Sequence, residues 1–81
     1  MAVSSGAVDG AEWITAFAAE AGVSRPSEEE VEQLLALAGI AAHASERTAA
    51  PISCWIAARA GLGPAEARAV AARLADAAGE Q

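Results

Sequence analysis

Most of the residue types that carry chemistry in proteins are scarce in this chain. A group of them begins at His43. His43 and Arg47 are four residues apart, so they share one face of a helix that extends that far. Pro51 follows, and proline is typical of the first turn of a new helix, whose N–H groups attract anions. With Ser53 as a further hydroxyl donor, the pattern predicts a ligand-binding site for an anion at His43, Arg47 and Ser53.

A simpler interpretation of the same residues stays open. Arg47 complements the negative end of its own helix, Glu46 pairs with an arginine, and His43 donates to a carbonyl of the turn. Charges of this kind are common at helix ends and contribute little when they are exposed. In this interpretation the group binds no ligand.

Patterns for catalysis and for metal binding are weak. His43 and Cys54 are the only histidine and the only cysteine, so a nucleophilic Cys–His pair requires these two residues to meet. Cys54 lies in an apolar run, and free cysteine is among the most buried residue types. A structural zinc site takes about four nitrogen or sulfur ligands, and the sequence has no glycine-rich phosphate loop. We therefore expect no catalytic residue, no metal site and no cofactor, and we do not expect an enzyme.

Composition and charge exclude further classes of function. Alanine supplies 25 of the 81 residues, and 11 acidic residues against 5 arginines give a formal net charge of −6. Nucleic-acid binding requires a basic surface, and an anionic membrane surface repels an acidic chain. The start does not resemble a signal peptide, and the longest charge-free stretch, residues 33–45, is shorter than the roughly 20 residues that span a bilayer. We expect a cytoplasmic protein that binds neither nucleic acid nor membrane.

The elements that position these residues are predicted to be helices. After a disordered tail over residues 1–8, apolar residues recur at intervals of three and four, without the alternation of a strand. The predicted helices span residues 10–21, 27–46, 51–60 and 64–78. They form a single domain over residues 9–79, whose expected fold is all-α, a compact four-helix bundle-like domain.

Residues at the helix ends support these boundaries. Asp9 and Ser27 are predicted N-caps, each followed three residues later by the glutamate of a capping box. Gly22 and Gly61 are placed for the left-handed conformation that ends a helix. The second helix is apolar around most of its circumference, so we expect it at the centre. The large apolar residues form the predicted core: Trp13, Phe17, Leu34, Leu35, Ile52, Ile56, Val70 and Leu74.

Several of these positions also carry a resemblance to a known family. The positions are Glu12-Trp13, Ala42-His43, Glu46-Arg47, Ala49-Ala50-Pro51 and the closing Gly61. Over residues 11–78 the sequence resembles a small, functionally uncharacterised actinobacterial domain family. Its members are found alone or joined to nucleotidyltransferases of the molybdenum-cofactor guanylyltransferase kind. The resemblance implies a helical domain with a link, through domain association, to molybdopterin-dinucleotide biosynthesis.

Three functions remain open at this point. The first is a non-catalytic accessory or interaction domain whose protein partner is a nucleotidyltransferase or a second copy of the chain. The second is a small anion- or nucleotide-binding domain with its site at His43 and Arg47. The third is a structural homodimer in which alanine-rich faces pack together, with alanines such as Ala57, Ala60 and Ala69 beyond what the core needs.

Overall fold

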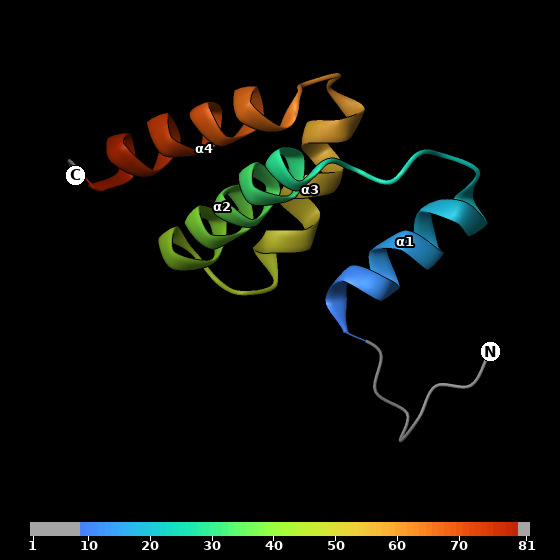
Figure 1. Ribbon diagram of the computed structural model, residues 1–81. Helices are drawn as coiled ribbons and strands as arrows, with labels where there is room; N and C mark the ends of the chain where they lie inside the picture. Colours follow the sequence, from blue (N-terminus) through green and yellow to red (C-terminus); the bar gives the residue numbers. More distant parts are fainter. Residues whose placement is uncertain (1–8, 80–81) are drawn as a thin grey trace.

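The computed structural model describes residues 9–79 and is all-α (Figure 1). Its helices are α1 (Gly10–Ala21), α2 (Glu28–Ala44), α3 (Ala49–Arg59) and α4 (Pro64–Gly79). Each predicted helix end lies within two residues of the observed one, and residues 9–79 contain no strand. The predicted four-helix bundle-like fold is therefore confirmed, while the predicted tail over residues 1–8 lies outside the described residues.

Side-chain caps begin α1 and α2 as the sequence predicts. The backbone N–H of Glu12 donates to the Asp9 carboxylate over 2.8 Å, and the backbone N–H of Glu30 donates to the Ser27 hydroxyl over 3.0 Å. Each glutamate carboxylate accepts in return from the backbone N–H of its cap residue. Both capping boxes are complete. At the start of α1 and at the start of α2, two backbone N–H donors that would otherwise be unpaired are therefore satisfied.

Left-handed glycines end α1 and α3. Gly22 has a φ of 79° and Gly61 a φ of 75°, values that side chains with a Cβ rarely adopt. Beyond Gly61, the N–H of Leu62 donates to the carbonyl of Ala57 over 3.0 Å, which is the long bond of a Schellman turn. This turn reverses the chain so that α4 can return along α2.

The core lies where α2 packs against both α3 and α4. Leu37 of α2, Ala57 of α3 and Ala67 of α4 are buried at its centre. The partly buried apolar residues packed around them are Leu34, Cys54, Leu62 and Ala71. The central position predicted for the second helix is thus correct, and small residues bring its two neighbours close.

The predicted membership of the core is mostly wrong. Seven of the eight predicted core residues are 40–71% exposed: Trp13, Phe17, Leu35, Ile52, Ile56, Val70 and Leu74. Leu34 alone packs against the core, and it is partly buried. The physical reason is that α3 and α4 approach α2 through alanines, which leaves their larger side chains pointing outward. Ala57, predicted as a surplus surface alanine, is at the centre of the core.

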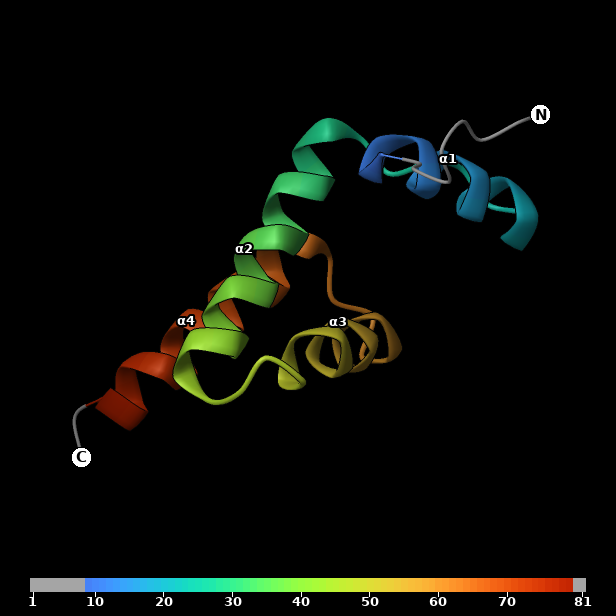
Figure 2. The same ribbon diagram turned by 90° about the horizontal axis from the view of Figure 1, so that it is seen from below.

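Helix α1 lies to one side of the other three helices (Figures 1 and 2). Its buried residue is Ala18, and no extensive packing joins α1 to α2, α3 or α4. The described chain is correspondingly elongated, with extents of 51 × 27 × 19 Å. The sequence predicted that Trp13 and Phe17 would enter a common core, and this separation explains why they do not.

Candidate functional site

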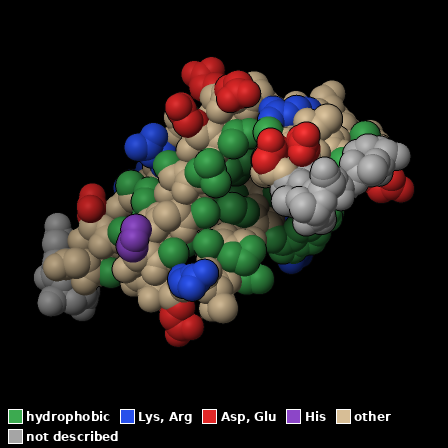
Figure 3. Space-filling view, turned by 60° about the horizontal axis from the view of Figure 1, so that its bottom comes forward, with side chains coloured by type: hydrophobic (Ala, Val, Ile, Leu, Met, Phe, Trp, Pro, Cys, Tyr) green, Lys and Arg blue, Asp and Glu red, His purple; other side chains and the backbone are tan. Residues whose placement is uncertain are grey.

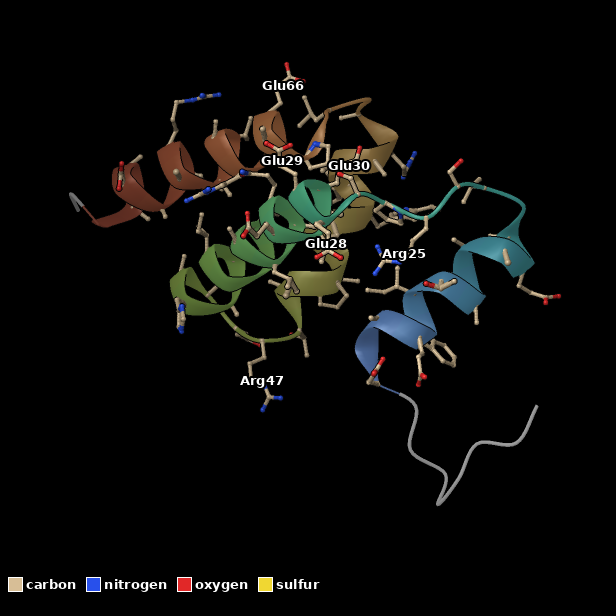
Figure 4. The ribbon with its side chains drawn as sticks, in the orientation of Figure 1. Arg25, Glu28, Glu29, Glu30, Arg47 and Glu66 are labelled. Atoms are coloured by element: carbon tan, nitrogen blue, oxygen red, sulfur yellow. The ribbon has the colours of Figure 1, made fainter. Side chains whose placement is uncertain are left out.

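The three residues of the predicted anion site lie around the turn between α2 and α3. His43 is exposed near the end of α2 and borders an open hollow that α2 shares with Ala75 of α4. Arg47 is exposed in the turn, and its side chain points away from the helices (Figure 4). Ser53 is half-buried in α3 and lines a different hollow, together with Glu46 and other residues of the turn. The structure therefore brings the three residues into one region but not into one concavity.

The start of α3 also offers fewer free donors than the sequence suggests. The N–H of Ala49 donates to the carbonyl of Glu46 over 3.0 Å, and the N–H of Ala50 donates to the carbonyl of Arg47 over 3.1 Å. Pro51 has no N–H. The Thr48 hydroxyl donates to the Glu46 carboxylate over 3.4 Å, which keeps a negative charge beside the turn. Anion binding at His43, Arg47 and Ser53 stays a prediction, supported mainly by the charge of Arg47.

The single cysteine and the single histidine lie in different environments. Cys54 is half-buried against the core, whereas His43 is on the surface. Within residues 9–79 no group of three or more His, Cys, Asp or Glu side chains is arranged to hold a metal ion.

None of the described helices has both the length and the apolar character that crossing a membrane requires.

Helix α1 carries an exposed apolar surface, although the sequence predicted its aromatic residues in the core. On α1, Trp13 and Phe17 are exposed side by side, with ring centroids 6.1 Å apart and an angle of 43° between the ring planes. They border an almost entirely apolar hollow that runs on to Val23 in the connector. We call Trp13, Phe17 and Val23 the α1 face.

A second exposed apolar surface lies on α3. Ile52, Trp55 and Ile56 follow helical spacing and are each more than half exposed, and we call these three residues the α3 face. The opposite side of α3 carries Cys54 and Ala57, which pack against the core. Figure 3 shows hydrophobic side chains gathered around a hollow on one side of the molecule. The sequence contained this stripe, but periodicity alone does not tell which side of an apolar helix meets its neighbour.

Comparison with protein families places the chain. Residues 6–81 match the model of a domain of unknown function, DUF6457. The chain belongs to this family. The match confirms the predicted resemblance to an uncharacterised domain family, while no curated protein and no solved structure matches the chain significantly. The surface features of this DUF6457 domain described above are the α1 face, the α3 face and the charged turn between α2 and α3.

Proposed function

We propose that this DUF6457 domain is a non-catalytic accessory module that binds a protein partner through the α1 face and the α3 face. The observation that supports it is that small apolar residues fill the core while the largest apolar residues lie on the surface. Among residues 9–79 only four are buried, and three of these are alanines. Both tryptophans and the phenylalanine lie outside, about 60–65% exposed. Contiguous exposed apolar surface of more than a few hundred Å² typically marks an interaction site.

The residue types on the two faces favour a protein as the ligand. Tryptophan is enriched among the residues that dominate binding energy at protein interfaces, where it fills pockets in the partner. The excess of acidic residues, a net charge of −6, disfavours nucleic acid and anionic lipid as ligands. An apolar protein surface rimmed by polar groups is the partner that this combination accepts best.

The resemblance described above supplies a first candidate partner. Members of the actinobacterial family that the sequence resembles occur joined to nucleotidyltransferases of the molybdenum-cofactor guanylyltransferase kind. We therefore include in the proposal a cytoplasmic role beside such an enzyme in molybdopterin-dinucleotide biosynthesis. In this role the domain contributes contacts and the enzyme contributes the chemistry.

The test is binding of the full chain to a molybdenum-cofactor guanylyltransferase, measured by biolayer interferometry. Trp55→Ala removes the largest side chain of the α3 face and should weaken binding at least about tenfold. Leu74→Ala is the matched control, because Leu74 is a comparably exposed apolar residue on α4. It should change affinity less than about twofold. The proposal is overturned if the chain neither binds the enzyme nor associates with itself at high concentration.

A further inference from the structure

We infer that the α1 face binds the α3 face of a second copy of this chain, so that two copies exchange their α1 helices in a symmetric dimer. This inference rests on the proposed function and names the partner of the same surfaces. In a symmetric two-fold dimer each contact between an α1 face and an α3 face is made twice. Four features of the structure support it.

The first feature is that α1 lacks the packing that a helix of its length needs. Isolated helices shorter than about 12–15 residues are marginal in water, and α1 has 12 residues. It buries Ala18 alone and presents the paired rings of Trp13 and Phe17 to solvent. A helix with one strongly apolar side and no neighbour gains most from packing that side against another apolar face.

The second feature is the connector, which directs α1 away from the α3 face of its own chain. The Arg25 side chain, labelled in Figure 4, donates through Nε to the Thr15 hydroxyl of α1 over 2.9 Å. It also donates through Nη1 to the carbonyl of Pro26 over 2.8 Å. The N–H of Val23 donates to the carbonyl of Ala18 over 3.0 Å, and Pro26 fixes its own φ. With the connector held in this way, α1 and α3 of one chain stay apart, as both ribbon views show.

The third feature is charge complementarity between the two surfaces. Helix α1 and its cap residue carry three acidic residues, Asp9, Glu12 and Glu20, and no basic residue. The charged residue of α3 is Arg59, which lies one turn after Trp55 on the side of the α3 face. In the turn before α3, the positive charge of Arg47 and the negative charge of Glu46 cancel each other. An acidic helix laid along a face that ends in arginine is attracted to it, whereas two α1 helices would repel each other.

The fourth feature is the area available. At about 150–250 Å² for each fully exposed aromatic side chain, Trp13, Phe17 and Trp55 leave on the order of 300–450 Å² in water. Ile52 and Ile56 add roughly 100 Å². Because each copy of a symmetric dimer contributes both faces, covering them buries on the order of 1,000 Å², which is about the minimum for a specific interface.

The experiment is sedimentation equilibrium of the full chain and its variants, since the monomer of 8.0 kDa and the dimer are easily distinguished. Phe17→Ala impairs the α1 face and Trp55→Ala impairs the α3 face. Both residues are exposed, so circular dichroism should retain the helicity of α2, α3 and α4, and at most the contribution of α1 should be lost. The wild type should dimerise, each variant alone should dimerise at least about tenfold more weakly, and Leu74→Ala should behave as wild type.

Mixing the two variants tests the exchange itself. A mixed pair regains one intact contact, between α1 of the Trp55→Ala copy and α3 of the Phe17→Ala copy, and carries both truncations in its other contact. Because two truncations within one contact cost less than the sum of their separate effects, an equimolar mixture should associate more strongly than either variant alone. A dimer that Trp55→Ala weakens but Phe17→Ala leaves unchanged is held by α3 against α3 and overturns the exchange. A monomeric wild type also overturns it, and guanylyltransferase binding that Trp55→Ala weakens would then leave the proposed function standing. A monomer that binds no enzyme overturns both.

Discussion

Truncation of Leu37 to alanine should be the most destabilising single change of an apolar residue in this domain. Leu37 is the one large side chain among the four buried residues of the described range, with 3% of its surface exposed. Removing its outer carbons forfeits about 0.8 kcal/mol per methylene in transfer free energy. Ala57 and Ala67, its closest buried neighbours, are too short to fill the cavity. The free energy of unfolding should therefore fall by about 3–5 kcal/mol.

That loss is large beside the stability of a small domain. At about 0.05–0.15 kcal/mol per residue, a chain of 81 residues has roughly 4–12 kcal/mol in total. A change of 1 kcal/mol moves the melting temperature of a domain of this size by about 4–8 °C, so Leu37→Ala should lower it by at least about 12 °C. Thermal and urea denaturation followed by circular dichroism at low protein concentration provide the measurement.

Leu74→Ala is the matched comparison, because it makes the same chemical change at a side chain that is 71% exposed. It should alter the free energy of unfolding by no more than about 0.5 kcal/mol. Leu35, which the sequence placed in the core, is 68% exposed and should behave in the same way in the monomer. If Leu74→Ala or Leu35→Ala costs as much as Leu37→Ala, the arrangement of α2 against α3 and α4 described above is wrong.

Three further predictions concern the helix ends and the charged turn. Ser27→Ala removes the N-cap of α2 and should cost about 1 kcal/mol of unfolding free energy in urea titrations, and an unchanged midpoint would show that this cap contributes nothing. Gly61→Ala should cost about 1–2 kcal/mol because of the positive φ of Gly61, whereas Gly39→Ala, inside α2 where an added Cβ also meets open space, should be neutral or stabilising by up to about 1 kcal/mol in the same titration. Arg47→Ala should abolish phosphate or molybdate binding in calorimetry while leaving the circular dichroism spectrum intact, and the absence of binding heat from the wild type at millimolar anion would dismiss the site.

The helices were predictable because their ends are determined by short-range chemistry. A cap such as Ser27 and a left-handed glycine such as Gly61 act within a few residues, so their effect is contained in the local sequence. The core was not predictable in the same way. Helix α3 is apolar on two sides, and only its contact with α2 decides that Ala57 faces inward and Trp55 outward. Alanine gives a weak periodic signal, so the larger residues dominated the prediction.

For the candidate sites too, the local sequence indicated some features, while others depend on how the chain folds. The spacing of His43 and Arg47 predicted one shared helix face, but α2 ends at Ala44 and Arg47 lies in the turn beyond it. The spacing also did not reveal that the turn's own carbonyls accept from the N–H groups of Ala49 and Ala50, because those bonds follow from a backbone path that begins α3 two residues before Pro51. The exposure of the α1 face and the α3 face depends on long-range placement too, since α1 lies to one side of the other helices.

The positions of the aromatic residues give this domain an unusual optical behaviour. Both tryptophans are on the exposed faces of α1 and α3, and the sequence contains no tyrosine. The packed centre around Leu37 therefore has no fluorophore of its own. Indole emission reports what covers the two faces, whereas far-ultraviolet ellipticity reports the helices. Under the proposed association, non-coincident transitions by these two signals arise from uncovering of the faces as well as from a folding intermediate, and only the former depend on protein concentration.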